Sequence, residues 1–307
     1  MATFTLTTGQ NLFNGSAGTD VFQGPAGGSD SLKGNAGNDF FNIQTGQTGL
    51  IDGGSGFDTL FMVGSTNNAF DLNLQILGVE QLIMEAPSLL ATAAQLKGFT
   101  YIGVSNSFTD FELSLRGAGG SLNFSTSYTE PQHLLVNAEL TTSAVKIVGS
   151  THSDEIIGSD FNDTVNGDKG ADVVRGGAGN DVVNGGLGND TVYGDDGRDS
   201  FMFDTALGGN LDHLGDFRPV DDTIRIDDDI FSWAGQLVGG LQEANFKVLG
   251  TGLTQDANDY ILYNQNTGVI SYDVDGAGGS AARAFAVADN FSGDVPVVTF
   301  RDFVIVA

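Results

Sequence analysis

The chain has 307 residues with 45 Gly, 5 Pro and no Cys, and its 39 acidic and 12 basic side chains give a formal net charge of −27. The lack of Cys excludes disulfides, thiolate metal sites and cysteine nucleophiles, and so negative a surface repels phosphate backbones and excludes nucleic-acid binding. The 40% hydrophobic content is enough to build a core, so the acidity does not indicate disorder.

The N-terminal segment, residues 1–61, contains a loose repeat that begins at Gly15. Its units are GSAGTDVFQ, a ten-residue variant GPAGGSDSLK, GNAGNDFFN and GGSGFDTLF, and the acids that follow each Gly-rich half are Asp20, Asp30, Asp39 and Asp58. The first residues, MATFTLTTGQNLFNG, have no basic region followed by an apolar stretch, so we expect no ordinary secretory signal peptide.

The next segment, residues 62–148, loses the repeat but keeps the alternation of apolar and polar residues that is typical of strands. This alternation predicts strands at 70–74, 112–115 and 122–125, and apolar positions near Ile83 and Leu135 are expected to fill irregular turns of a solenoid. A short helix is predicted with its cap at Ser88 and its end at Gly98. No run of about 18 apolar residues occurs here or elsewhere, so no membrane-spanning helix is predicted.

Residues 149–202 divide into six consecutive nonapeptides: GSTHSDEII, GSDFNDTVN, GDKGADVVR, GGAGNDVVN, GGLGNDTVY and GDDGRDSFM. The first residue is always Gly and the sixth is always Asp, at Asp154, Asp163, Asp172, Asp181, Asp190 and Asp199. The eighth is always apolar, at Ile156, Val165, Val174, Val183, Val192 and Phe201. We interpret each unit as a Gly-rich turn with a carboxylate at its end, followed by a three-residue strand with one inward apolar side chain.

The C-terminal segment, residues 203–307, begins where the regular repeat stops at Met202. Residues 259–276 predict a hairpin around Asn266. Asp273, Asp275 and Gly276 faintly resemble an EF-hand loop, but Ala284 stands where that loop needs Glu, which favours a turn.

Oxygen ligands without Cys and almost without His suit Ca²⁺ rather than zinc. The nonapeptides resemble those of the repeats-in-toxin (RTX) family, whose calcium-binding repeat is a known β-helix motif. The resemblance implies an all-β parallel β-roll, or β-helix solenoid, with Ca²⁺ bound between the turns of repeats n and n+2. It pairs Asp154 with Asp172, Asp163 with Asp181, Asp172 with Asp190, and Asp181 with Asp199.

The metal ligands expected from this resemblance are the six Asp residues of the regular repeats together with Gly176, Gly177, Gly179, Gly185, Gly186, Gly188, Gly194, Asp20, Asp39 and Asp58. Several Ca²⁺ ions are expected. Residues 149–202 hold eleven acids and three bases, and four ions would neutralise the net charge of −8. His152 and Phe161 replace Gly at the fourth position, where a positive φ would be costly, so their turns are expected to bind more weakly.

Other parts of the chain carry related resemblances. Residues 211–228 resemble the segment that caps the roll in RTX proteins, and the middle segment resembles connecting regions of RTX and S-layer-type secreted proteins. The final RDFVIVA, which starts at Arg301, resembles the C-terminal address of type I secretion substrates and also suits an ordinary last strand. Type I secretion machinery is therefore an expected partner.

These features predict a secreted, extracellular, non-enzymatic calcium-binding protein, with a surface-layer, matrix or adhesion role. Cell-surface or matrix polysaccharide and self-association are its expected partners. The chain has no HExxH or GxSxG motif. Two alternatives remain: a polysaccharide lyase or epimerase, and a secreted effector that acts on host membranes. The candidate catalytic residues of the enzyme are Asp110, Glu112 and Glu130 with Tyr101 or Tyr128.

Overall fold

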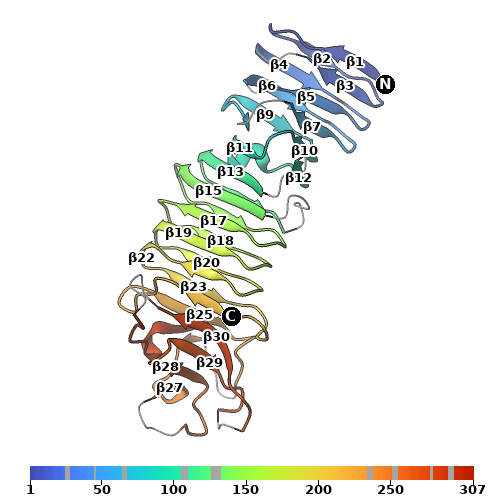
Figure 1. The fold of residues 1–307 in the computed structure, drawn as a ribbon. Coiled ribbons are helices and arrows are strands. Elements are labelled where there is room, and N and C mark those ends of the chain that lie inside the picture. Colours follow the sequence, from blue (N-terminus) through green and yellow to red (C-terminus); the bar gives the residue numbers. More distant parts are fainter. Residues whose placement is uncertain are drawn as a thin grey trace. The chain divides into compact units, whose positions relative to one another are not determined.

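The computed structural model describes residues 1–24, 28–44, 46–63, 68–104, 110–125, 133–233, 238–250, 255–276, 279–289 and 294–307. The chain consists of two compact units, Met1–Lys146 and Ile147–Ala307. Each unit is built of short strands that pair mainly in parallel with the strands of the next turn (Figure 1). The predicted all-β, parallel solenoid is confirmed.

The first part of unit 1 winds between two sheets. One sheet contains β1 (Ala2–Thr5), β3 (Asp20–Gln23), β5 (Phe40–Ile43), β7 (Thr59–Met62), β10 (Gln81–Met84) and β12 (Tyr101–Val104). The other contains β2 (Leu12–Asn14), β4 (Gly28–Lys33), β6 (Gln47–Asp52) and β9 (Leu74–Leu77). Phe22 lies in register with Phe41, and their rings stack with centroids 4.7 Å apart in the core.

The second part of unit 1 contains β8 (Asn68–Ala69), β11 (Ser88–Ala91), β13 (Asp110–Gly117), β14 (Ser121–Asn123) and β15 (His133–Thr141), and β16 (Lys146–Val148) spans the boundary. The predicted strand at 112–115 lies within β13. The prediction of a strand at 70–74 is wrong, because Asp71 accepts a hydrogen bond from the Asn73 backbone N–H and closes a turn there. The strand at 122–125 begins earlier and ends at Asn123.

The short helix is α1 (Ala93–Leu96), and its predicted start is wrong. Ser88 lies in β11, whereas the N-cap is Thr92. Thr92 and Gln95 form a capping box in which each side chain accepts a hydrogen bond from the other residue's backbone N–H. The capping box, rather than the earlier serine, therefore fixes the helix start.

The nonapeptides of unit 2 alternate between two parallel sheets. The first runs through β17 (Glu155–Ser159), β19 (Val173–Gly179), β21 (Thr191–Tyr193) and β24 (Asp212–Leu214), with β22 (Asp196–Gly197) beside β19. The second runs through β18 (Thr164–Asn166), β20 (Val182–Asn184), β23 (Ser200–Phe203), β25 (Thr223–Asp227) and β31 (Phe303–Val306), and β26 (Gly239–Gly240) pairs antiparallel with β31 at its edge. The six eighth-position apolar residues are at most 2% exposed, so they form the core as predicted.

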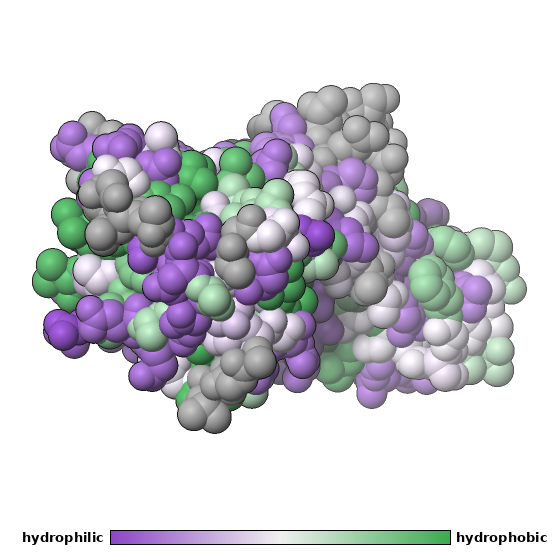
Figure 2. All heavy atoms as spheres, turned by 90° about the horizontal axis from the view of Figure 1, so that it is seen from below, coloured by the Kyte–Doolittle hydropathy of each residue, from purple (hydrophilic) through white to green (hydrophobic). Residues whose placement is uncertain are grey.

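The remaining elements of unit 2 are β27 (Phe246–Leu249), β28 (Ile261–Asn264), β29 (Val269–Tyr272), β30 (Arg283–Ala288) and the 3₁₀ turns η1 (Glu243–Asn245) and η2 (Phe300–Asp302). Antiparallel pairing of β28 with β29 confirms the predicted hairpin. Large apolar side chains such as Val220 and Val297 are exposed singly, and Figure 2 shows apolar surface interrupted by hydrophilic residues. Among the described residues, no helix has the length and apolar character needed to cross a membrane.

Candidate metal sites

The sixth-position aspartates of unit 2 are linked from turn to turn by their own backbone. The N–H of each Asp donates to Oδ1 of the Asp one turn further on: Asp154 to Asp172 (2.8 Å), Asp163 to Asp181 (2.7 Å), Asp172 to Asp190 (2.8 Å) and Asp181 to Asp199 (2.9 Å). All six Asp are at most 2% exposed. The pairs expected from the RTX resemblance therefore lie on neighbouring turns.

Unit 1 repeats this arrangement with longer steps. The Asp20 N–H donates to Asp39 Oδ1 and the Asp39 N–H to Asp58 Oδ1, both at 2.7 Å. The series ends at Glu80, whose Oε2 accepts the Asp58 N–H at 2.8 Å. Glu80 lies outside any nonapeptide, so the repeat did not identify it.

One oxygen of most of these carboxylates is buried without a hydrogen-bond partner. Among the described residues these atoms include the Oδ2 atoms of Asp39, Asp58, Asp172, Asp181, Asp190 and Asp199. Leaving a buried carboxylate oxygen unpaired is costly. Six such atoms lie at equivalent positions, where a cation would offset this cost.

Burial also makes the charged form of these carboxyl groups unfavourable. It raises the pKa of Asp172 to about 8, that of Asp199 to about 7 and that of Asp181 to about 6, and the charges of neighbouring acids add to the effect. The pKa values of Asp39 and Asp58 are raised for the same reasons. A bound divalent cation would reverse this balance.

The predicted glycines shape the space around the carboxylates. A Cβ on the first-position Gly176, Gly185 or Gly194 would lie 2.5 Å from Oδ2 of the Asp that ends the same turn. The second-position Gly177 and Gly186 have φ of 99° and 98°, and the fourth-position Gly179 and Gly188 have φ of 137° and 149°. Side chains are thus excluded beside the unpaired oxygens.

An ion here would draw its ligands from the backbone as well as from Asp. The described residues contain no group of three or more His, Asp or Glu that could hold a metal by side chains alone. A Cβ on Gly167 would lie 2.4 Å both from Asp172 Oδ2 and from the carbonyl oxygen of Gly185, so a carboxylate and a carbonyl converge at one point. Carboxylate and carbonyl oxygens are the ligands that Ca²⁺ prefers, so these residues fit it.

Asp154, Asp163 and Asp20 differ from these six aspartates, because a serine donates hydrogen bonds to each of their carboxylates. The backbone N–H groups of Ser150, Ser159 and Ser16 donate to their Oδ2 atoms at 2.6, 2.5 and 2.5 Å, respectively. For Asp20, burial alone would raise the pKa, but hydrogen bonds from Ser16 and Ala2 outweigh it and the pKa is lowered. These three carboxylates are satisfied within the protein.

The expectation that His152 and Phe161 adopt a costly positive φ is wrong. Neither is among the residues with positive φ. Their N–H groups donate instead to the hydroxyl oxygens of Ser150 and Ser159, at 3.1 and 3.2 Å. The second-position serine closes these turns in another way, and glycine is not needed at the fourth position.

The regular repeat ends at Met202, but turns of the same geometry continue beyond it. The Asp190 N–H donates to Asp212 Oδ1 (3.2 Å), and the Asp199 N–H donates to Asp222 Oδ1 (3.1 Å). The strand at Asp212, β24, pairs in parallel with β21, and the strand after Asp222, β25, pairs in parallel with β23. Residues 207–215 and 217–225 are therefore two degenerate nonapeptides with Asp at the sixth position. The segment 211–228, expected only to cap the roll, also extends it.

Further carboxylates in this extension were missed by the sequence analysis. Asp216 accepts the N–H groups of Gly194 (2.9 Å) and Asp195 (2.7 Å), and burial raises its pKa to about 6. Burial raises the pKa of Asp212 to about 8. The available signal was an Asp followed two residues later by an apolar residue, which recurs at Asp212 with Leu214 and at Asp222 with Ile224.

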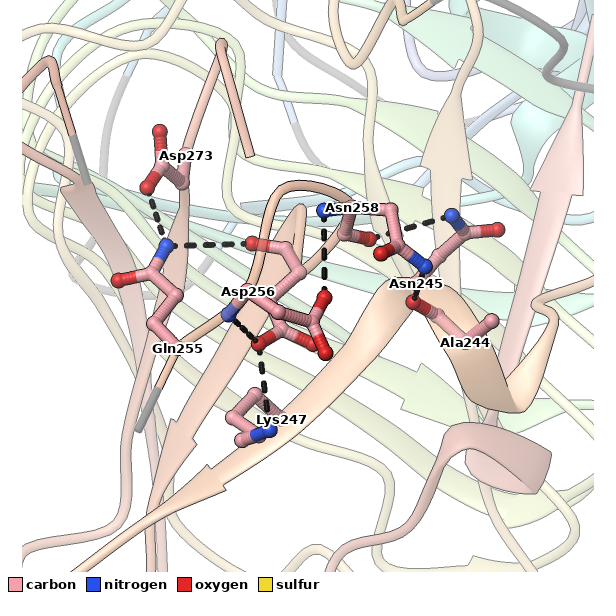
Figure 3. A network of polar contacts seen from close by, with 8 residues as sticks. Ala244, Asn245, Lys247, Gln255, Asp256, Asn258 and Asp273 are labelled. Carbon is pink, nitrogen blue, oxygen red and sulfur yellow. Dashed lines mark hydrogen bonds and ion pairs between the residues drawn. The ribbon is translucent and has the colours of Figure 1, made fainter. Parts of the chain in front are cut away.

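The acids near the C-terminus have partners within the protein (Figure 3). Lys247 Nζ lies 3.3 Å from Asp259 Oδ2, which also accepts the Asp256 N–H at 2.7 Å. Gln255 donates to the Asp273 carboxylate. The Asp275 N–H donates to Asp273 Oδ1 at 3.2 Å where the chain bends at residues 274–276, in keeping with the predicted turn. No oxygen of Asp256, Asp259 or Asp273 is among the described buried atoms that lack a hydrogen-bond partner.

The described candidate catalytic residues lie in two different sheets. Asp110 and Glu112 are exposed on β13, and Asp110 lies 3.3 Å from His133 Nδ1. Tyr101 lies in β12, in a different sheet. Tyr128 and Glu130 lie outside the described residues.

Comparisons with known proteins agree with the calcium-binding turns. Residues 14–42, 148–183 and 167–201 match the family described as RTX calcium-binding nonapeptide repeat (4 copies), so the chain carries RTX calcium-binding repeats. No curated protein matches the chain. The solution structure of the AlgE6R3 subunit from the Azotobacter vinelandii mannuronan C5-epimerase is 24% identical over 51% of this chain and 80% of that chain, with a TM-score of 0.30. A likeness this distant carries no argument about function.

Proposed function

We propose that this chain is a secreted protein whose β-solenoid folds when Ca²⁺ binds outside the cell, and that its role is non-enzymatic, at a cell surface, in a matrix or in adhesion. The observation that carries the proposal is the set of six buried Oδ2 atoms without partners in equivalent turns. The residues that would hold the ions are Asp39, Asp58, Asp172, Asp181, Asp190 and Asp199, with carbonyl oxygens of the adjoining Gly-rich turns.

The calcium dependence follows from mass action. Extracellular calcium sites bind with dissociation constants of about 10⁻⁴ M, so about 1 mM Ca²⁺ adds about 1.4 kcal/mol per site. Four sites in unit 2 add about 5–6 kcal/mol, which is comparable to the whole stability of a domain. At cytosolic Ca²⁺ concentrations this stabilisation vanishes and the buried aspartates repel one another.

Circular dichroism during a calcium titration tests this step. We expect the β signal to appear cooperatively as Ca²⁺ is added and to disappear in excess chelator, with Mg²⁺ at the same concentration as the matched control. An equal β signal in chelator and in saturating Ca²⁺ would contradict the proposal.

The proposed C-terminal secretion address must be tested with a variant that still folds. β31 pairs with β25 and Phe303 is fully buried, so deleting Arg301–Ala307 would disturb folding as well as a secretion address. Val306→Lys changes only the half-buried last residue of the strand. We expect this variant to remain inside cells that carry a type I exporter, with unchanged calcium affinity, and its normal export would refute the address.

The non-enzymatic role has its own test. Purified protein in saturating Ca²⁺ is incubated with acidic polysaccharides, and new unsaturated ends or changed uronate stereochemistry are measured. Turnover that Asp110→Asn or Glu112→Gln abolishes would establish the enzyme instead.

A further inference from the structure

The second residue of the nonapeptides that begin with Gly divides their nine turns into two kinds. In three of them, called serine turns here, this residue is Ser16, Ser150 or Ser159. In the six turns that end in a carboxylate with an unpaired Oδ2, called open turns here, it has a positive φ between 63° and 99°. The second residues of the open turns are Asn35, Gly54, Asp168, Gly177, Gly186 and Asp195.

The serine turns share one pattern of hydrogen bonds. The serine N–H donates to Oδ2 of the Asp four residues later, and the hydroxyl donates to the same carboxylate: Ser150 Oγ lies 2.9 Å from Asp154 Oδ1 and Ser159 Oγ 2.8 Å from Asp163 Oδ2. The hydroxyl oxygen also accepts the N–H of the fourth residue. The serine thus supplies the donors that the carboxylate would otherwise lack.

A left-handed second residue accompanies the loss of this N–H donation. In the open turns, no hydrogen bond reaches Oδ2 from the second residue or from any other group in the described chain. Gly, Asn and Asp tolerate this conformation best, whereas serine at an ordinary φ keeps its N–H on the carboxylate. One backbone torsion therefore distinguishes the two kinds of turn.

The N-terminal block shows that the second residue decides, and not the fourth. Gly18 in the turn of Asp20 and Gly37 in the turn of Asp39 both occupy the fourth position. Gly37 has a φ of 114°, but Gly18 lacks the left-handed conformation and donates its N–H to Ser16 Oγ at 3.2 Å. Although glycine occupies the fourth position, the conformation of this turn is that of the other serine turns.

We propose that a serine at the second position makes a turn independent of metal, and that Gly, Asn or Asp there makes it a Ca²⁺ site. This inference rests on the calcium binding proposed above and assigns which turns use it. The serine turns are the first nonapeptide of the N-terminal block and the first two of the six regular repeats. Each run of repeats thus begins with turns that close without an ion, and ion-dependent turns stack upon them.

Ser16→Gly is the sharpest test, because it changes GSAGTD to GGAGTD in a turn that already has Gly18. We expect isothermal titration calorimetry of the full chain to detect one more bound Ca²⁺ than in the unchanged protein. Ser16→Ala is the matched control: it removes the hydroxyl but does not favour a positive φ, so it should add no ion. Equal stoichiometry in Ser16→Gly and the unchanged chain would overturn the inference.

The reverse change is Gly177→Ser, in the open turn of Asp181. A Cβ on Gly177 would lie 2.3 Å from the Ser159 carbonyl oxygen at the present φ, so serine should force the turn into the other conformation. We expect one bound Ca²⁺ fewer, with the β signal in saturating Ca²⁺ retained. If this variant does not fold, Gly54→Ser tests the same loss in unit 1.

The outcomes separate this inference from the proposed function. An unchanged chain that binds no Ca²⁺ would refute the proposed function itself. A chain that binds Ca²⁺, with a stoichiometry that neither Ser16→Gly nor the glycine-to-serine variants alter, would refute only the role of the second residue.

Discussion

The two units place aspartate at equivalent turns but satisfy it differently. In unit 2 the odd and the even nonapeptides form two series of turns, and each series contains unpaired carboxylate oxygens, on Asp172 and Asp190 in one and on Asp181 and Asp199 in the other. Among the described residues of unit 1, such oxygens occur in the series of Asp20, Asp39 and Asp58, on Asp39 and Asp58. The difference lies in the neighbours of the carboxylates.

The other series of unit 1 contains Asp30, which is completed by amides. Asn11 donates its N–H (2.7 Å) and its side-chain NH₂ (2.8 Å) to Asp30 Oδ1, and Gln47 Nε2 donates to Oδ2 at 2.7 Å. Two side-chain amides thus take the place that a cation would have. A buried aspartate at the correct spacing is therefore insufficient evidence for a calcium site, because neighbouring hydrogen-bond donors can satisfy its carboxylate without an ion.

The largest effect that tests this comparison is the removal of calcium. At about 1.4 kcal/mol per site, the four open turns of unit 2 lose about 5–6 kcal/mol and the two of unit 1 about 3 kcal/mol. We expect hydrogen exchange in excess chelator to show loss of protection through 167–202, with residual protection in β4 and β6 beside Asp30. Equal loss of protection in both regions would contradict the distinction.

The pH dependence in chelator should be the reverse of that of a salt-bridged protein. The pKa values of Asp172, Asp199 and Asp181 are raised in the folded state to about 8, 7 and 6, from an ordinary value of 3.8. Stability from these groups is therefore fully present below about pH 4 and is lost as the pH rises through 6 to 8. We expect the calcium-free roll to gain β signal and thermal stability on acidification from pH 8 to about 5.

Saturating Ca²⁺ provides the control for the pH experiment. The ions hold the same carboxylates in their charged form, so the gain on acidification should vanish and protons should compete with binding. A calcium-free protein that becomes less stable as the pH falls from 8 would show that the buried aspartates are already satisfied.

Substitution of single aspartates gives a smaller effect with a clear ranking. Asp181 faces neighbouring turns on both sides, through Asp163 and Asp199, and its Oδ2 is unpaired. Asp20 is completed by Ser16 and Ala2. We expect Asp181→Ala to disturb two sites, with a loss of about 3 kcal/mol in Ca²⁺ and a higher calcium midpoint for folding, and Asp20→Ala to change the midpoint little. Calorimetric titration of both variants measures this, and equal effects would refute the ranking.

Much of the fold could be predicted from the sequence because its determinants are local and periodic. The nine-residue spacing identifies both the turn and the inward residue, as for Val174 and Val183. Where the period is lost, adjacent apolar residues compete for the core: Leu82 and Leu134 are buried, whereas Ile83 and Leu135, near which the core was expected, are only partly so. Periodicity alone could not choose between neighbours.

The candidate sites were less predictable, because their occupancy depends on contacts between turns. Asp20 and Asp39 fit the nonapeptide equally well, but Ser16 donates hydrogen bonds to Asp20, whereas Asn35 in the turn of Asp39 has a positive φ and Asp39 Oδ2 has no partner. Asp222 lies in a turn whose glycines are replaced by Phe217 and Arg218. The amino-acid sequence therefore no longer shows the repeat, although the backbone geometry of the turn is retained. These hydrogen bonds depend on which residues the fold brings together, and the nine-residue pattern does not record them.

The smallest effect is expected from Asp30→Asn, which tests whether spacing or neighbours define a site. An asparagine at position 30 still offers Oδ1 to Asn11, and its NH₂ group would face Gln47, whose Oε1 is buried without a partner. A turned Gln47 amide could accept that NH₂ group. The turn would cost the Gln47 hydrogen bond to the Thr48 carbonyl oxygen (3.1 Å) but would leave one buried charge fewer. We expect unchanged calcium stoichiometry and a stability change within about 1 kcal/mol, the scale of a single exchanged hydrogen bond. Asp39→Asn is the matched control, with the same chemistry at an open turn, and should lose one ion. Loss of an ion from Asp30→Asn would mean that position in the repeat outweighs the amides that surround it.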